Sequence, residues 1–414
     1  MKGMVQTKPL VDSSAVCLGD GEKIRADAIC WQGIHIGAVR NDSEGRPHIF
    51  RDLPSGHSAH WTCEVNLQTG RKTGPAGVDW LTVPLAESLA NPSGEGVTVK
   101  REILRPGRQI IILNCLDMMY GHSLLKLLNA SRHLEDNPER GLVVLVPSFL
   151  RWLVPDGVAE IWSVPLSLKA MKKFYPSIDR QINAFCEDYD SIWLSEAFSH
   201  PSRFRIEDYT RICPHDFSEQ QDLVTFIWRE DRLWLPHYPA KKLRKAGLQS
   251  WALAWQKRKV IKFFHEIRRR FAVARFAVAG LGTNGHFPDW IEDHRTNRFD
   301  EASERMTAQL YANSRIVIGV HGSNMLLPSG LAGMIIDLMP GDKWQCLPED
   351  ILFREANPRM AIFRYRCIAS ESSPAVVAGV AGSMLQQFRV LPLFLHEDCV
   401  IGKNKLRQTD APRR

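Results

Sequence analysis

Long apolar runs are missing from the sequence, and this absence bears on where the protein works. No uninterrupted apolar stretch approaches the roughly 18 residues that a membrane-spanning helix needs. The N-terminus, MKGMVQTKPLVDSS, also lacks the apolar core of a secretory signal. The nine cysteines are scattered, odd in number and form no Cys-x-x-Cys pair, so they predict reduced thiols and not a disulfide scaffold. We therefore expect a cytoplasmic protein, with peripheral contact at a membrane left open.

The length and the charge of the chain set the next bounds. Its 414 residues exceed the roughly 250–300 that one hydrophobic core usually organises, so two domains are expected. Hydrophobic residues at 44% and charged residues at 24% are ordinary for a globular protein. The net charge of +7 is uneven, because Lys241 to Arg275 holds twelve Lys or Arg residues and one acid, Glu266. An anionic partner is therefore expected near this segment.

Short apolar strands and helix-length segments alternate in two blocks after residue 100. The expected strands lie at 109–113, 141–147, 159–164 and 191–198, then at 223–228, 276–281, 315–320, 334–339 and 360–366. The expected helices lie at 121–134 and 168–185, then at 243–264 and 300–313, with a short one after residue 324. Alternating βα units predict parallel sheets.

This alternation predicts an α/β protein with two Rossmann-like domains. The expected parts are an irregular β-rich region at 1–100, Rossmann-like domains at 101–215 and 216–375, and a C-terminal segment at 376–414 that packs back and ends in a frayed tail. A stretch with Pro and His at 200–217 is the expected linker.

The strongest functional pattern is a buried strand that runs into His321, Gly322, Ser323 and Asn324, followed by a short helix and a second buried strand. Ligands of open α/β sheets lie beyond the carboxyl ends of the strands, where this turn falls. Gly322 lets the backbone approach a ligand, and Ser323 and Asn324 are expected to cap the helix, whose free N–H groups suit a diphosphate. His321 can donate a hydrogen bond to it. The alternative is a tight turn with a solvent-facing histidine.

Two further loops are expected at the same edge. Arg229 and Arg232 follow the first strand of the second block, where guanidinium groups can grip phosphate oxygens. Alternatively, Glu230 and Asp231 neutralise them in a surface cluster. A third loop holds Gly282, Thr283, Asn284 and Gly285 after strand 276–281.

These motifs together resemble glycosyltransferase family 61, a GT-B group that includes plant xylan-modifying enzymes and the extracellular O-linked N-acetylglucosaminyltransferase. The matching positions, within residues 120–340, are Arg229 at a strand end, the His321–Asn324 turn with Ser323 in place of the usual Ala, Asp337 in the next strand, and Tyr120, Gly121 and His122 opening a helix. The resemblance implies two Rossmann-like domains that face a cleft, with the donor nucleotide sugar held by the second domain. It also implies inversion at the transferred sugar, an acceptor that is a saccharide or glycoconjugate, and no metal or other cofactor.

Sugar transfer requires a stabilised leaving diphosphate and a base for the acceptor hydroxyl. Arg229, Arg232, Gly282, Thr283 and the His321–Asn324 turn are the candidates for donor binding. The candidate bases are Asp117 and His122, which follow the strand at 109–113. His122 can equally be a structural residue at a helix end.

Other readings of the sequence remain open. Gly280, Gly282 and Gly285 form the GxGxxG pattern of an NAD-dependent oxidoreductase, although no helix is expected directly after it. In the basic segment, aromatic residues interleave with Lys and Arg, as in nucleic-acid-binding proteins; their helical spacing is also that of a buried face. These aromatic residues are Trp251, Trp255, Phe263 and Phe264.

Three weaker patterns point to other chemistry. Asp188-Tyr189-Asp190 matches the metal-binding motif of GT-A enzymes but precedes a strand instead of following it. His57, His60 and Cys63 have ligand-like spacing, but zinc prefers four ligands and no fourth is evident. Ser323 lacks the GxSxG spacing of a hydrolase nucleophile.

Overall fold

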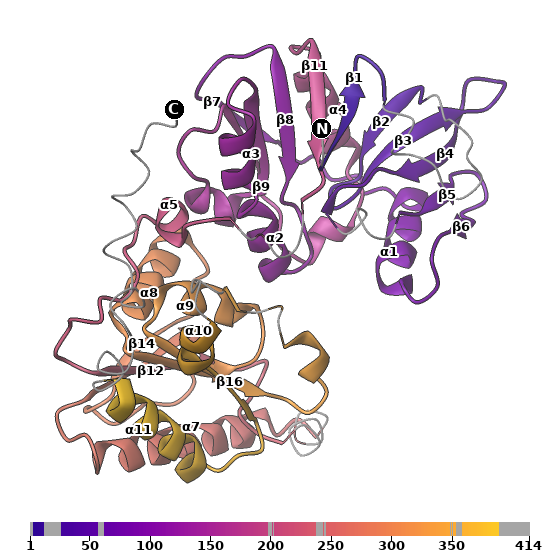
Figure 1. Ribbon diagram of the computed structural model, residues 1–414. Helices are drawn as coiled ribbons and strands as arrows, with labels where there is room; N and C mark the ends of the chain where they lie inside the picture. Colours follow the sequence, from indigo (N-terminus) through magenta and orange to yellow (C-terminus); the bar gives the residue numbers. More distant parts are fainter. Residues whose placement is uncertain are drawn as a thin grey trace, which may run out of the picture. The chain divides into compact units, whose positions relative to one another are not determined.

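The chain divides into two units, Met1–Arg211 and Ile212–Arg414, which are described separately. The computed structural model describes residues 3–11, 26–56, 62–197, 201, 203–236, 243, 246–347, 349, 351–352 and 358–388 (Figure 1). His57, His60, His200, most of the first residues of the basic segment and the C-terminal tail lie outside these ranges. The predicted α/β class is confirmed: parallel strands and helices build both units.

The larger sheet of the first unit has six strands in the order β1-β11-β8-β9-β10-β7. Its strands are β1 (Met4–Lys8), β7 (Lys100–Ile103), β8 (Gln109–Asn114), β9 (Gly141–Pro147), β10 (Glu160–Val164) and β11 (Ser191–Ser195). The four inner strands are parallel, as expected for their buried apolar runs. The edge strands β1 and β7 are antiparallel and were not predicted.

The helices of this unit correct two predictions. The single helix expected at 121–134 is two helices, α2 (Tyr120–Leu127) and α3 (Ala130–Asp136). The helix expected at 168–185 is a 3₁₀ turn, η4 (Ala170–Lys172), followed by α4 (Pro176–Cys186). Proline at the first position of α4 explains its start, because this position needs no N–H donor. A 3₁₀ segment η3 (Ser148–Leu153) and a short α5 (Ile206–Thr210) also belong to this unit.

The N-terminal region is more regular than expected. A five-stranded antiparallel sheet contains β2 (Ala28–Trp31), β3 (Ile36–Asn41), β4 (Pro47–Asp52), β5 (Glu64–Asn66) and β6 (Lys72–Thr73). An unpredicted helix, α1 (Asp79–Ala90), covers it through Leu85, which is buried with Val39, Phe50 and Val65. Gly37 is required in β3, because a side chain there would collide with the Phe50 ring.

The second unit contains one sheet of six parallel strands in the order β14-β13-β12-β15-β16-β17. The strands are β12 (Leu223–Arg229), β13 (Arg275–Leu281), β14 (Glu292–Thr296), β15 (Ile316–Val320), β16 (Met334–Met339) and β17 (Tyr365–Ala369). Numbered from the first strand of this sheet, the order is 3-2-1-4-5-6, that of doubly wound nucleotide-binding sheets. The strand order therefore reverses between β12 and β15.

Helices cover both faces of this sheet (Figure 1). They are α7 (Gln249–Arg268), α8 (Glu301–Asn313), α9 (Leu326–Leu331), α10 (Pro358–Arg364) and α11 (Pro374–Phe388). On one face, Phe263 and Phe264 of α7 and Val377 of α11 pack into a core with Phe226 and Ile318 of the sheet.

Two boundaries in this unit differ from the prediction. The strand expected at 360–366 is mostly helix α10, and only its last residues enter β17, which does close the sheet. The apolar segment expected from residue 376 is helix α11, which starts at Pro374. Within the described part of the chain, no helix is both long enough and apolar enough to cross a membrane.

Candidate functional site

The reversal of strand order brings the loops after β12 and β15 together at the carboxyl edge of the second sheet. Val224, Thr225 and Phe226 of β12 pair in parallel with Ile316, Val317 and Ile318 of β15, so both strands end at this edge. Arg229 ends β12, and His321 directly follows β15. Because neighbouring connections leave the sheet in opposite directions at such a point, a crevice forms there, and ligands of doubly wound folds bind in it.

Arg229 and Arg232 both reach the loop that follows β15. Arg229 Nη1 donates to Asn324 Oδ1 at 2.6 Å, and Arg232 Nη1 donates to the main-chain oxygen of His321. The structure thus brings together two arginines and a turn that lie about 90 residues apart in sequence. This places four of the predicted donor-binding residues within one cluster.

Gly322 lies directly under the two guanidinium groups. Its φ of 146° belongs to the region that favours glycine. A Cβ at this position would collide with the Arg232 guanidinium and lie 3.1 Å from Arg229 Nη1. Glycine is therefore needed both for the backbone conformation and for the close approach of the arginines.

Asp231 accepts two hydrogen bonds from the Arg229 guanidinium. Arg229 Nε donates to Asp231 Oδ1 at 2.8 Å, and Nη2 donates to Oδ2 of the same carboxylate. Burial opposes ionisation of Asp231, but the hydrogen bonds and positive charge of Arg229 outweigh it and lower the pKa of this carboxyl. The alternative that the two acids neutralise the two arginines is therefore confirmed for Asp231, which pairs with Arg229. It is wrong for Glu230, which has other partners. A phosphate must compete with Asp231 for this arginine.

Glu230 instead ties the third predicted loop to β12. Its Oε1 accepts from the main-chain N–H of Asn284 at 3.0 Å, and its Oε2 accepts from the Asn284 side chain. Gly282, with φ of 104°, leaves room for this carboxylate, since a Cβ there would collide with it. Thr283 Oγ1 accepts from Asn297 at 2.7 Å and is exposed. Gly282 and Thr283 are thus at the same edge, after β13, which β12 separates from β15.

His321 is buried and not solvent-facing. Its Nδ1 donates to Asp337 Oδ2 at 2.7 Å, and each side chain is 1% exposed. Burial raises the pKa of the Asp337 carboxyl, and the hydrogen bond from His321 offsets this only in part. With Nδ1 as donor to Asp337, the ring presents an N–H at Nε2 only as the imidazolium. The pair fixes the turn that carries Gly322, and direct contact of the ring with a ligand remains a prediction.

The predicted capping of the helix by Ser323 and Asn324 is wrong. A 3₁₀ turn, η5 (Ser323–Met325), separates Gly322 from α9, and neither segment has a side-chain cap. The Asn324 side chain is used elsewhere, since its Oδ1 accepts from Arg229 and its Nδ2 donates to Val320 O at 3.3 Å. The arginines therefore supply the positive charge that the helix end was expected to supply.

The two candidate bases of the first unit lie next to each other after β8, together with an unpredicted lysine. Lys126 Nζ lies 2.8 Å from Asp117 Oδ2, and both side chains are almost completely buried. His122 Nδ1 lies 3.5 Å from Asp117 Oδ1, and the His122 side chain is 20% exposed. Asp117 also accepts from the main-chain N–H of Met119 at 3.1 Å. Asp117 is therefore held by contacts within the protein, and His122 is the better placed of the two to meet a substrate.

The free energy of unfolding of this unit should depend on pH through His133 of α3. Its Nε2 lies 2.6 Å from Ser195 Oγ at the end of β11. Burial, followed by the positive charge of Arg132, lowers the pKa of His133 from 6.5 to about 4. The unfolded chain therefore takes up this proton first as the pH falls. The contribution of neutral His133 to the free energy of unfolding is fully present above about pH 6.5. It falls by on the order of 2–3 kcal/mol as the pH drops towards 4.

Replacing His133 by glutamine should remove this part of the pH dependence. The check is urea unfolding of both proteins at pH 7 and at pH 4.5, with His286→Gln at an exposed position as the matched control. Equal pH dependence in the wild type and His133→Gln would contradict the assignment.

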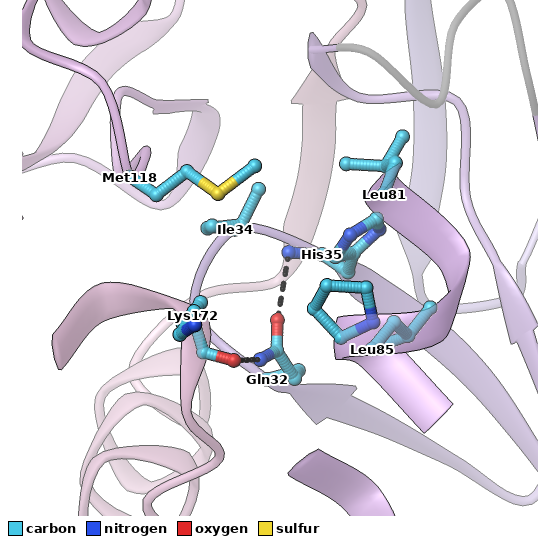
Figure 2. Close-up of a pocket in the computed structure, with 8 residues that line it drawn as sticks. Gln32, Ile34, His35, Leu81, Leu85, Met118 and Lys172 are labelled. Atoms are coloured by element: carbon cyan, nitrogen blue, oxygen red, sulfur yellow. Dashed lines mark hydrogen bonds between the residues drawn. The ribbon is translucent and has the colours of Figure 1, made fainter. Parts of the chain in front are cut away.

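A small pocket in the first unit does not fit a nucleotide. It is lined by Gln32, Ile34, His35, Leu81, Pro84, Leu85, Met118 and Lys172 (Figure 2). Even with open solvent included, its empty volume is about 210 Å³, below the roughly 300 Å³ at which ligand pockets begin. His35 Nδ1 donates to buried Asp52 at 2.7 Å, and Gln32 bridges the main chains of His35 and Lys172. These bonds join the N-terminal sheet to η4 and indicate a structural role.

The other predicted metal and motif residues have partners of their own. Asp188 pairs with Arg101 at 2.6 Å and Asp190 with Arg108 at 3.6 Å, at the start of β11. No cluster of three or more His, Cys, Asp or Glu side chains that could hold a metal occurs among the described residues.

Comparisons with known proteins add little. No known protein family matches the sequence, and no curated protein matches it either. Matches among solved structures include the one titled "Crystal Structure of TarM", with 11% identity and a TM-score of 0.25. That match covers 86% of this chain and 59% of the other, so this chain spans less than two thirds of that protein. A TM-score this low does not establish a shared fold.

Proposed function

We propose that the second unit binds the diphosphate of a nucleotide sugar between the ends of β12 and β15, and that the protein is a metal-independent glycosyltransferase of the GT-B type. The observation that carries this proposal is the convergence of Arg229 and Arg232 on Gly322, at the reversal of strand order. The family resemblance of the same residues supports it, and polysaccharide or glycoconjugate synthesis is the corresponding role.

The chemistry of sugar transfer explains why two arginines would be placed there. As the glycosidic bond to the donor breaks, negative charge builds up on the leaving diphosphate. Guanidinium groups fixed in advance stabilise that charge without reorganisation during the reaction. The Arg229 side chain donates to Asn324, and its main-chain oxygen accepts from Gln256 of α7 at 3.0 Å. The position of Arg229 is therefore set before a ligand arrives.

We assign the proton transfer from the acceptor hydroxyl to His122. Among the candidate bases it is the one with exposed surface, while Asp117 is buried beside it and can stabilise its protonated form. Lys126 pairs with Asp117 and holds it in place beside His122 in this assignment. Replacing His122 should lower turnover and leave nucleotide binding nearly unchanged.

An NAD-dependent oxidoreductase fits less well. The dinucleotide fingerprint needs a helix that starts directly after the glycine loop. Here the described residues between β13 and β14 contain no helix, and the next helix is α8. Gly280 and Gly282 are instead explained by packing, because side chains there would collide with Trp228 O and with Glu230.

A thermal-shift screen tests the proposal. The full-length protein is melted with UDP, GDP, CMP, NAD or a short single-stranded oligonucleotide, in buffer with EDTA. A ligand that binds only the folded state raises the melting temperature. A shift with one nucleoside diphosphate in EDTA supports the proposal and identifies the base. A shift only with NAD or the oligonucleotide contradicts it.

Two substitutions at the arginine cluster should change nucleotide affinity in opposite directions. Arg229→Ala removes charge-assisted hydrogen bonds and should weaken binding of the nucleoside diphosphate by about 1–3 kcal/mol. Asp231→Asn removes the competing carboxylate and should tighten binding about two- to fivefold, the scale of an exposed ion pair. Titration calorimetry measures both.

The control for Asp231→Asn is Glu266→Gln, which makes the same charge change at a carboxylate that pairs with Arg269 on α7. It should leave the affinity unchanged. If Asp231→Asn and Glu266→Gln tighten binding equally, the effect is one of net charge and Arg229 does not contact the diphosphate.

A further inference from the structure

The outer face of α7 carries aromatic and basic side chains that do not pack into the second unit. Trp251, Trp255, Arg258, Lys262 and Arg269 follow one another at spacings of 4, 3, 4 and 7 residues. These spacings place them on one side of an α-helix. The opposite side holds the buried residues Ala252, Leu253, Gln256, Val260, Phe263, Phe264 and Ile267. The two faces are therefore distinct, and the first one is called the outer face below.

The structure corrects the predicted role of the two tryptophans. Their helical spacing with Phe263 and Phe264 predicted a shared buried face. In fact Trp251 is 71% and Trp255 46% exposed, and Leu248 beside them is 43% exposed. Large aromatic side chains grouped on a surface are typical of places where a protein, a ligand or a membrane binds.

The second half of the outer face is basic. Arg258, Lys262 and Arg269 are all exposed. The acid on this helix is Glu266, whose Oε2 lies 3.5 Å from Arg269 Nη1. Helix α11, which packs along α7 (Figure 1), contains no acidic residue. Arg258 and Lys262 thus give the outer face a positive charge that a nearby anionic surface would complement.

We propose that the outer face of α7 binds the surface of an anionic phospholipid bilayer, with Trp251 and Trp255 at the level of the headgroups and Arg258 and Lys262 against their phosphates. Tryptophan favours the membrane interface, because its ring is apolar and its N–H is polar. Basic side chains near an anionic bilayer surface are attracted to it, so a helix with both kinds of side chain on its free face can lie along such an interface.

The arrangement favours lipid over single-stranded nucleic acid. Proteins that bind single strands combine a positively charged groove with aromatic side chains on which successive bases stack. On α7 the exposed tryptophans precede the exposed basic residues along one helix face. Tryptophan rings and the phosphates that bind Arg and Lys lie at the same depth of a bilayer, at the headgroups, so a single helix face can meet both.

Helix α7 also contacts the loop of the proposed nucleotide site. Gln256, on the buried side of α7, accepts from the main-chain N–H of Trp234 at 2.6 Å and donates to Arg229 O. The helix that meets the lipid therefore also positions the arginine loop. The inference does not depend on the nucleotide proposal, since lipid binding is measured without any nucleotide.

Sedimentation with vesicles tests this inference on the full-length protein. Vesicles contain either phosphatidylcholine alone or phosphatidylcholine with phosphatidylglycerol. Wild-type protein should sediment with the anionic vesicles at low ionic strength and stay in solution with the neutral ones. Arg258→Gln with Lys262→Gln should weaken binding about 25-fold, because each basic side chain near an anionic surface contributes about a fivefold factor. Trp251→Ala with Trp255→Ala should weaken it about tenfold or more.

Matched variants separate the outer face from overall charge and hydrophobicity. Arg105→Gln with Arg108→Gln makes the same charge change at exposed positions in the first unit, and Trp344→Ala removes a tryptophan that is 45% exposed. Both should sediment like the wild type. The inference is overturned if wild-type protein ignores anionic vesicles, or if the controls lose as much binding as the α7 variants. It is also overturned if the α7 variants lose only binding to a single-stranded oligonucleotide.

Discussion

Replacing Gly322 by valine should strongly weaken the binding of a nucleoside diphosphate. The φ of 146° at this position disfavours any side chain, and a Cβ would collide with Arg232 and crowd Arg229. Both guanidinium groups would have to move away from the edge between β12 and β15. Since each contributes charge-assisted hydrogen bonds to an anion, we expect affinity to fall about 100-fold or more, measured by titration calorimetry. The backbone strain should also lower the free energy of unfolding by about 1–3 kcal/mol.

The matched control is Gly341→Val. Gly341 follows β16 near the same edge, and a Cβ there would meet no atom within 4 Å. This variant should bind the nucleotide like the wild type. Wild-type affinity in Gly322→Val would mean that the arginine cluster is not the diphosphate site, whereas loss of affinity in both variants would mean that the edge as a whole is sensitive to substitution.

The strands of the second unit show which parts of a fold can be predicted from sequence. Continuous apolar runs form β12, β13, β15 and β16, because helices cover both faces of a parallel strand. Such runs can be recognised in a sequence. β14 was missed because its sequence, EDHRT, has no apolar residue. It is an edge strand, and Glu292 at its start pairs with Arg275 of β13 at 2.7 Å. Its identity as a strand depends on that neighbour and not on its own residues.

The misplaced strand at 360–366 has a different cause. MAIFRYR is a short apolar run, and periodicity alone cannot assign such a run to strand or helix. Pro358 marks the first position of α10, and this signal was available in the sequence. The break between α2 and α3 near Asn129 had no comparable signal, because the apolar spacing continues through it. Asn129 bonds there to Leu125 O and Lys126 O, which only the folded chain reveals.

Part of the candidate site could be predicted from the sequence because of the sheet topology. Arg229, Arg232 and His321 were expected together because the carboxyl ends of parallel strands share one edge, and the structure places them there. The pairing of Asp231 with Arg229 does not follow from the sequence, because side-chain direction in a loop cannot be derived from spacing. Lys126 was overlooked, although a lysine flanked by Leu124, Leu125, Leu127 and Leu128 signals a buried charge.

That buried charge leads to the second large expected effect. Lys126→Met should lower the free energy of unfolding by about 3–5 kcal/mol, because it removes the buried cation that lies 2.8 Å from the Asp117 carboxylate. Lys126 Nζ also donates to Leu116 O at 3.0 Å, and this bond is lost as well. By contrast Lys100→Met, which breaks an exposed pair with Glu102, should cost under about 1 kcal/mol. Urea unfolding measures both.

The double variant Asp117→Asn, Lys126→Met distinguishes a charge effect from lost packing. Asparagine can still accept from the main-chain N–H of Met119, and no buried charge remains, so most of the stability should return. We expect a residual loss of about 1–2 kcal/mol from the unpaired Leu116 carbonyl. If the losses of the two single variants simply add, the carboxylate and the lysine do not stabilise each other, and Asp117 becomes available as a base.

If the double variant is stable but inactive while His122→Asn is stable and retains activity, the proton transfer belongs to Asp117 and not to His122.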